Sequence, residues 1–152
     1  MNKIAIGLLI DVKHDLAPNN QSNVINIKKA FLPLMLKLEP QDVLLFSNDG
    51  QEVYAYVRPG EFTAAISNLQ PNIKVNVPKV IKELVNGLAD LPNDYKKKLI
   101  IITDSKKFQY YFHTADVEIK IYGIGIELQV PFFEKLEDTS KLLEIKFSDI
   151  GN

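Results

Sequence analysis

The sequence predicts one α/β domain with a doubly wound, mainly parallel six-stranded sheet, one antiparallel edge strand and helices on both faces. Wholly apolar segments alternate along the chain with segments of helical periodicity, which is the pattern of repeated βαβ units. The apolar segments show no polar alternation, so helices must cover both faces of the sheet. The chain has 152 residues, the common size of one domain, so residues 1–152 are expected to form a single unit.

The composition limits the classes of partner and the compartment that we expect. Eighteen basic and nineteen acidic residues give a net charge of -1, so the overall charge does not favour nucleic acid or an anionic membrane. Cysteine is absent, which excludes disulfides and thiolate metal sites and fits a reducing compartment. The apolar run at residues 4–10 is too short for a signal peptide or a membrane span. We therefore expect a cytoplasmic protein.

The first apolar segment, residues 4–10, is expected to be a central strand, because it carries no polar side chain. A polar, turn-prone stretch follows, and Asn23 is placed to cap a helix that extends to Leu38. Apolar residues recur in this helix at spacings of three and four, which gives it one buried stripe. The stripe consists of Val24, Ile27, Phe31, Leu34, Met35 and Leu38.

A β-hairpin and two helices are expected next. Residues 42–47 and 52–57 have the composition of strands, and the Asn-Asp-Gly sequence between them favours a tight turn. The second of these strands should therefore run antiparallel to the first, at an edge of the sheet. Residues 61–69 show a short helical pattern, and residues 77–91 show the clearest helical periodicity of the chain.

Three more strands and one helix are expected in the remainder. Residues 99–103 have the composition of a fully buried parallel strand, and residues 117–126 are expected to repeat this pattern. Residues 131–139 are predicted to form a short helix with a proline near its start, and residues 142–147 the last strand. The basic run Lys96-Lys97-Lys98 directly precedes a buried strand, where charges in solvent commonly protect an exposed end. We expect these three lysines to be solvated.

Polar side chains follow two of these strands at the points where the strands end. Asp11 ends the first strand, and Lys13 and Asp15 come shortly after it. Asp104 and Ser105 directly follow the predicted strand at residues 99–103. Ligands of open parallel sheets usually bind beyond the carboxyl ends of the strands. These five residues are therefore the first candidates for a binding site.

The order of several short motifs resembles that of von Willebrand factor A (vWA) domains. Residues 6–11 (Ile-Gly-Leu-Leu-Ile-Asp), 101–104 (Ile-Ile-Thr-Asp) and 121–125 (Ile-Tyr-Gly-Ile-Gly) follow one another as they do in this family. Residues 38–46 are similar to the second strand of the family, and residues 132–136 to the helix after its fifth strand. The resemblance spans almost the whole chain. It implies a Rossmann-like sheet and a protein-binding function.

The resemblance also bears on metal binding. Domains of this family hold a divalent metal at a metal-ion-dependent adhesion site (MIDAS), built from an Asp-x-Ser-x-Ser motif, a threonine and a later aspartate. Asp11 and Asp104 match the two aspartates, but Lys13 and Asp15 stand at the two serine positions. Mg²⁺ requires near-octahedral oxygen ligation, and a lysine ammonium group can supply the neutralising charge itself. We therefore expect a degenerate MIDAS without a bound cofactor; Mg²⁺ held by Asp11, Asp15 and Asp104 is the alternative.

The sequence offers no assignable catalytic residues. His14 and His113 are the only imidazoles, and neither lies near a pattern of Ser, Cys or Asp residues typical of a hydrolase triad. Gly123 and Gly125 do not belong to a Gly-x-Gly-x-x-Gly run that opens a helix, so no motif supports nucleotide binding. Close approach of the backbone at a strand end explains these glycines better.

An aromatic cluster follows Asp104. It consists of Phe108, Tyr110, Tyr111, Phe112 and His113. Exposed aromatic side chains commonly anchor protein partners, so Phe108 and Tyr110 are added to the candidate binding surface. The alternative is that these aromatic side chains cover one face of the sheet as part of the core.

The leading hypothesis is a protein-interaction or adaptor module that acts without a metal. Its candidate partner-binding residues are Asp11, Lys13, Asp15, Asp104, Ser105, Phe108 and Tyr110. A second hypothesis is a Mg²⁺-dependent phosphotransfer or nuclease enzyme that uses Asp11, Asp15 and Asp104, because carboxylates at the ends of parallel strands also hold catalytic Mg²⁺. A third is a structural subunit of an oligomeric assembly. No sequence pattern identifies the partner or the oligomeric state.

Overall fold

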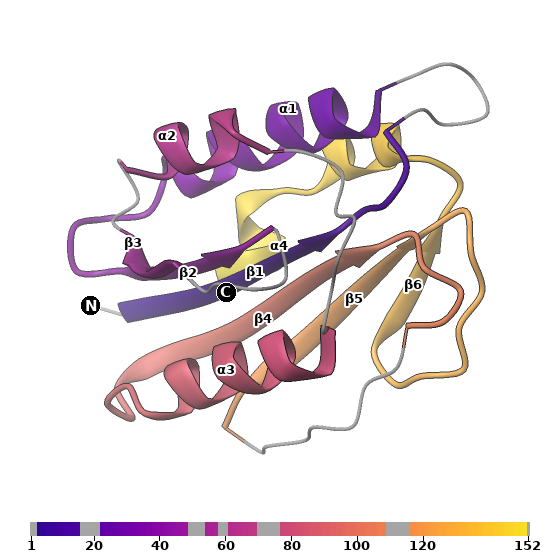
Figure 1. The fold of residues 1–152 in the computed structure, drawn as a ribbon. Coiled ribbons are helices and arrows are strands. Elements are labelled where there is room, and N and C mark those ends of the chain that lie inside the picture. The colour runs from indigo at the N-terminus through magenta and orange to yellow at the C-terminus, as the bar shows by residue number, and fades with distance from the viewer. Residues whose placement is uncertain are drawn as a thin grey trace.

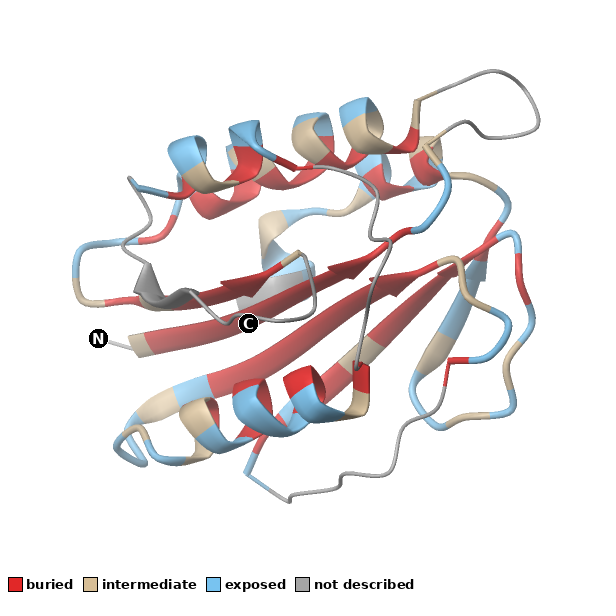
Figure 2. Cartoon of the chain, viewed as in Figure 1, coloured by how far each residue is buried: buried red, intermediate tan, exposed pale blue. Residues whose placement is uncertain are grey.

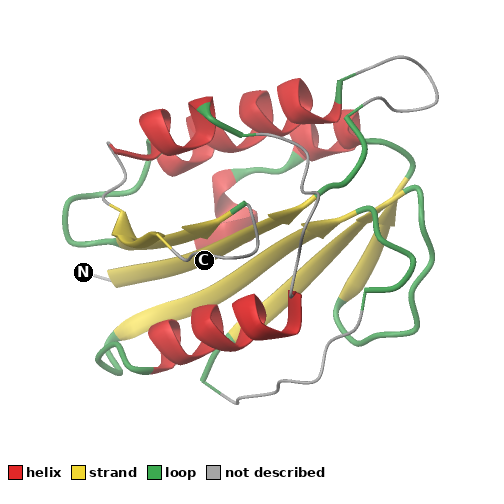
Figure 3. Ribbon diagram, viewed as in Figure 1, coloured by secondary structure: helices red, strands yellow, loops and turns green. Residues whose placement is uncertain are grey.

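The computed structural model describes residues 3–15, 22–48, 54–57, 61–69, 77–108 and 116–151. These residues include one six-stranded sheet with the strand order β3-β2-β1-β4-β5-β6. Figure 3 shows this sheet in yellow with helices on either side of it. Its strands are β1 (Lys3–Asp11), β2 (Val43–Ser47), β3 (Tyr54–Val57), β4 (Tyr95–Thr103), β5 (Glu118–Ile124) and β6 (Phe133–Leu136). β3 runs antiparallel to β2, and the other neighbouring strands are parallel. The sheet is therefore mainly parallel.

Helices cover both faces of this sheet. They are α1 (Asn23–Met35), α2 (Phe62–Ser67), α3 (Val77–Ala89), the 3-10 helix η2 (Thr139–Glu144) and α4 (Phe147–Gly151). Figure 1 shows α1 and α2 on one side of the sheet and α3 on the other. No helix in the described ranges is long and apolar enough to cross a membrane. The predicted α/β class, with a mainly parallel sheet covered on both faces, is confirmed.

Successive residues of β1 point into two separate hydrophobic cores. Ile6, Leu8 and Ile10 belong to the core formed with α1, α2 and η2. Ala5 and Leu9 belong to the core formed with α3. This alternation is the period of two of a strand, and burial on both sides explains why the strand carries no polar residue between Lys3 and Asp11. Figure 2 shows β1 and most of β4 buried along their length.

β1 and β4 lie side by side along their whole lengths, from the pair Lys3 and Tyr95 to the pair Asp11 and Thr103. On the other side of β1 lies β2, whereas β5 and β6 lie beyond β4. The order of the strands therefore reverses its direction between β1 and β4. Ligands of doubly wound sheets bind at such a topological switch point, outside the carboxyl ends of the strands. The loops that follow β1 and β4 meet at this point.

Backbone geometry requires the two glycines at the end of β5. A Cβ atom on Gly123 would lie 2.3 Å from Cε2 of the Phe133 ring on β6, so a larger residue would force these groups apart. Gly125 has a φ angle of 64°, in the left-handed region that favours glycine. At Gly123 the close approach is that of a side chain, the Phe133 ring, whereas Gly125 is explained by its backbone conformation.

Two predictions for the C-terminal part are wrong. Residues 131–139, predicted as a helix, contain β6, because Phe133–Leu136 pairs with the edge of β5. Residues 142–147, predicted as the last strand, lie in η2, in the link after it and at the start of α4. Asp138 caps the first turn of η2 with its side chain. The open edge of β5 and this cap decide both structures, and neither is visible in local periodicity.

The basic run at the start of β4 is also placed differently from the prediction. Lys96 is exposed, but Lys97 and Lys98 are only 5% and 8% exposed. Lys97 Nζ donates hydrogen bonds to the backbone oxygens of Ala89 (3.1 Å) and Leu91 (2.6 Å) at the C-terminal end of α3. Lys98 Nζ donates to a backbone oxygen of α4 at 2.5 Å. Buried ammonium groups need such acceptors, and Lys97 also complements the negative end of the α3 dipole.

Replacing Lys97 by methionine should destabilise the protein, because the last carbonyl groups of α3 lose a buried charged donor. We expect the free energy of unfolding in urea to fall by about 1–3 kcal/mol. Lys96→Met changes an exposed neighbour on the same strand and should alter the free energy by less than about 0.5 kcal/mol. Equal effects of the two substitutions would contradict the role assigned to Lys97.

Candidate functional site

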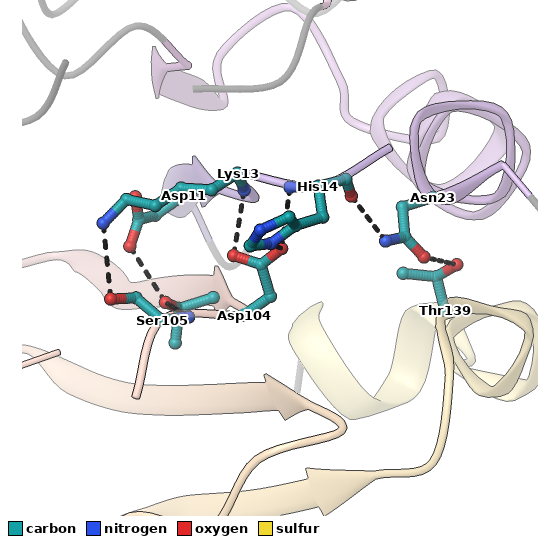
Figure 4. A network of polar contacts seen from close by, with 8 residues as sticks. Asp11, Lys13, His14, Asn23, Asp104, Ser105 and Thr139 are labelled. Carbon is teal, nitrogen blue, oxygen red and sulfur yellow. Dashed lines mark hydrogen bonds and ion pairs between the residues drawn. The ribbon is translucent and has the colours of Figure 1, made fainter. Parts of the chain in front are cut away.

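Asp104 joins the loop after β4 to the loop after β1 (Figure 4). Its Oδ1 accepts a hydrogen bond from the backbone N–H of Lys13 at 2.9 Å, and its Oδ2 accepts one from the backbone N–H of His14 at 2.9 Å. The Nδ1 atom of the His14 ring lies 3.2 Å from the same Oδ2. The Asp104 side chain is only 8% exposed. Donors of this chain, more than solvent, therefore stabilise its negative charge.

Asp11 is fully buried at the end of β1. Its Oδ2 accepts a hydrogen bond from the Thr103 hydroxyl at 2.9 Å, and the same hydroxyl oxygen accepts one from the backbone N–H of Ser105 at 3.1 Å. The backbone N–H of Asp104 donates to the backbone oxygen of Asp11 at 3.3 Å. The register of β1 against β4 places Asp11 opposite Thr103 and so creates these contacts. Asp11 therefore holds the two strand ends together.

Basic side chains lie on the exposed side of the same strand ends. Lys13 is exposed, and its Nζ donates a hydrogen bond to Ser105 Oγ at 3.3 Å. The His14 side chain is 78% exposed, and Lys106 and Lys107 after Ser105 are exposed as well. We call Lys13, His14 and Ser105 the strand-end surface. A partner that approaches this surface meets an ammonium group, an imidazole ring and a hydroxyl group, while the two carboxylates lie buried.

Asp15 has a different role, at the start of α1. Its Oδ1 accepts hydrogen bonds from the Ser22 hydroxyl (2.8 Å) and from the backbone N–H of Val24 (3.0 Å). Ser22 in turn caps α1 with its side chain, the role predicted for Asn23. The Asp15 carboxylate therefore stabilises the first turn of a helix, where a negative charge is favoured by the helix dipole.

A buried polar network, which the sequence analysis missed, connects the loop after β1 to the C-terminal segment. Asn23 Nδ2 donates to the backbone oxygen of His14 at 2.7 Å, and Thr139 Oγ1 donates to Asn23 Oδ1 at 2.9 Å. Asn26 Nδ2 donates to Thr139 Oγ1 at 3.0 Å. Thr139 is fully buried and Asn23 is 3% exposed. The only local signal was the polarity of Asn23 and Asn26 beside the apolar stripe of α1, because Thr139 lies 116 residues from Asn23 in the chain.

The residues at the strand ends do not fit a divalent metal as they are arranged. Both oxygens of Asp104 accept hydrogen bonds from backbone N–H groups, and the Asp15 carboxylate is bound to the start of α1. Within the described ranges, no three or more His, Cys, Asp or Glu side chains form a group that could hold a metal ion. The ammonium group of Lys13 adds a positive charge to this edge. Mg²⁺ needs near-octahedral oxygen ligation, which this donor set does not offer.

Phe108, predicted as a partner contact, is a core residue. It is 5% exposed and belongs to the core on the α3 side of the sheet. A hydrogen bond of 3.1 Å from its backbone N–H to the oxygen of Ser105 closes the turn that brings it back against the sheet. The prediction for Phe108 is therefore corrected. Tyr110 and residues 111–113 of the aromatic cluster lie outside the described residues.

Removing the Asp104 carboxylate should loosen the loop after β1, because the N–H groups of Lys13 and His14 lose their acceptor. In Asp104→Ala we expect amide hydrogen exchange at these two residues, measured by NMR, to accelerate roughly tenfold or more. Asp90→Ala removes an exposed carboxylate after α3 and should leave both rates unchanged. Equal exchange rates in the wild type and Asp104→Ala would show that Asp104 does not hold this loop.

No family model and no curated protein matches this sequence, but solved structures do. Proximal thread matrix protein 1 from the mussel byssus is 14% identical, with a TM-score of 0.69; the alignment covers 98% of this chain and 45% of that protein. The VWA domain of SpRpn10 is 12% identical, with a TM-score of 0.63, and 94% of each chain is covered. A von Willebrand factor type A protein from Catenulispora acidiphila is 14% identical, with a TM-score of 0.69 and coverage of 94% and 41%.

This chain therefore spans less than half of the mussel and Catenulispora proteins and nearly all of the SpRpn10 domain. Another structure of the mussel protein, with a TM-score of 0.67, has zinc in its MIDAS motif. At identities of 12% to 14% the likeness concerns the path of the chain. It includes almost every described strand and helix, as the order of the sequence motifs predicted. This chain has the von Willebrand factor A fold.

Proposed function

We propose that this chain is a protein-interaction module that binds its partner through the strand-end surface and does so without a divalent metal. The contact between the Lys13 ammonium group and the Ser105 hydroxyl carries this proposal. It places an exposed positive charge at the topological switch point, where sheets of this class bind their ligands. The fold alone would not assign a function, so the proposal rests on the residues at this site.

The hydrogen bonds around Asp104 and Asp11 support a binding role. They link the two loops that carry Lys13 and Ser105, so the surface is ordered before a partner arrives. A preorganised surface loses less conformational entropy on association than a mobile one. An exposed ammonium group at such a site favours a partner that offers an acidic group. The buried aspartates position this surface, and Lys13 and Ser105 contact the partner.

The same groups support the proposal of metal independence. The mussel protein has zinc in its MIDAS motif, whereas here Lys13 stands at one serine position of that motif and already brings a positive charge. A divalent ion would be repelled by this ammonium group and would have to compete with the N–H donors for Asp104. The Mg²⁺-dependent enzyme has no comparable support, because Asp15 does not join Asp11 and Asp104. No specific contact among the described residues favours a structural subunit.

Divalent metals should not stabilise the protein if Lys13 supplies the charge. Ligands that bind only the folded state raise the melting temperature, so we expect metal-stripped protein to melt within about 1 °C of its original temperature when millimolar Mg²⁺, Mn²⁺ or Ca²⁺ is added. A rise of several degrees that Asp104→Ala abolishes would restore the metal site and with it the enzyme hypothesis.

Reversal of the charge at Lys13 should weaken partner binding. With the purified protein as bait in extracts of its source cells, we expect Lys13→Glu to lower the recovery of specifically bound proteins roughly tenfold. Lys82→Glu makes the same change at an exposed position of α3 and should retain the partners. If Lys13→Glu and the wild type recover the same proteins in the same amounts, the assignment of this surface is refuted.

A further inference from the structure

A cavity of about 420 Å³ lies between β5, β6 and the C-terminal helical segment. Its volume falls within the range of about 300–1,000 Å³ that is usual for ligand pockets. Tyr122 of β5, Glu134 of β6 and Asp149 of α4 contribute to its walls, and the apolar side chains of Leu136 and Ile145 contribute as well. None of the residues of the strand-end surface lines it. The cavity is therefore distinct from the strand-end surface.

The charged groups around this cavity are predominantly acidic. Four carboxylates line it, against the two ammonium groups of Lys135 and Lys141. Lys135 forms an ion pair of 3.5 Å with Glu127, which does not line the cavity. Lys141 pairs with Glu144, one of the four, at 3.7 Å, and Lys120, which does not line the cavity, pairs with Glu134 at 3.0 Å. The four carboxylates are those of Glu134, Glu137, Glu144 and Asp149. The balance of charge favours a cationic occupant.

A second observation at this cavity, independent of the carboxylates, concerns Tyr122. The residue is only 7% exposed, yet its hydroxyl group has no hydrogen-bond partner among the described residues. Buried hydroxyl groups are normally hydrogen-bonded, because an unsatisfied one costs free energy. Burial, together with the nearby carboxylates of Glu134 and Asp149, raises the pKa of Tyr122 to about 12. The hydroxyl group is therefore protonated at neutral pH and is free to donate or accept a hydrogen bond.

We propose that this cavity binds the guanidinium group of an arginine side chain, presented by a basic segment of a partner protein. A divalent metal is a poorer occupant, because the described carboxylates do not converge into a metal-binding group. A guanidinium group is planar and carries five N–H donors, so it can reach carboxylates on several elements and the Tyr122 oxygen at once. Its flat faces also suit the apolar walls. This site does not depend on the function proposed for the strand-end surface.

An NMR titration with a short peptide tests the site directly. The probe is acetyl-Gly-Arg-Gly-amide, and its control is the same peptide with citrulline, which keeps the shape of arginine but has no charge. We expect the arginine peptide to produce saturable shifts of the backbone amides of Tyr122, Glu134 and Asp149, and the citrulline peptide to bind roughly tenfold more weakly. No saturable shift, shifts at other surfaces only, or equal binding of both peptides would overturn the proposal.

Two variants identify the groups responsible. Tyr122→Phe removes only the hydroxyl group, and Glu137→Gln removes one exposed carboxylate of the wall; each should weaken arginine binding about threefold or more. Glu83→Gln, on the exposed side of α3, should have no effect. Lys13→Glu should leave this titration unchanged, which separates a failure here from a failure of the strand-end surface. Unaltered binding in both Tyr122→Phe and Glu137→Gln would place the peptide elsewhere.

Discussion

The parallel pairing of β1 with β4 is the interaction on which the rest of the structure depends. It joins residues that are 92 positions apart, as in the contact of Asp11 with Thr103. Closing so long a loop costs conformational entropy, and burial of both strands between two helical layers offsets that cost. Every other strand is added outward from this pair. The same pairing decides which loops meet at the switch point, and therefore where the strand-end surface lies.

The chemistry of that surface follows from a second constraint, the need to satisfy buried carboxylates. Asp11 and Asp104 lie at the ends of the central strands, where little solvent reaches them. A buried carboxylate is tolerated only with hydrogen-bond donors, and the Thr103 hydroxyl and the N–H groups of Lys13 and His14 provide them. The hydrogen bonds of the two aspartates therefore hold the loops in place, and the basic side chains lie on the exposed side of the site. The two aspartates of the site are therefore buried, and the surface that the site exposes to solvent is basic.

Much of the fold could be predicted because its signals are local. Apolar runs marked β1 and the second half of β4, a largely apolar segment marked β5, and the three-to-four spacing marked α1 and α3. The rule that ligands bind at strand ends correctly brought Asp11 and Asp104 together with Lys13 and Ser105. The C-terminal part was mistaken because β6 forms only against the open edge of β5, and the burial of Lys97 depends on the end of α3. Such partners are distant in the chain and leave no periodic signal.

Local patterns in the sequence were enough to predict the class of fold, the order of most main elements and the pair of strand ends at which a site would form. These depend on burial and backbone preference, which composition and spacing record directly. Contacts between distant parts of the chain determine which polar groups of the site hold the fold together and which can contact a ligand. Thr139 donates a hydrogen bond to Asn23 across 116 residues, and Phe108 turns back into the core. The Tyr122 hydroxyl has no hydrogen-bond partner within the part of the chain that the structure describes. Hydrogen-bond satisfaction depends on distance in space, which a single sequence does not contain.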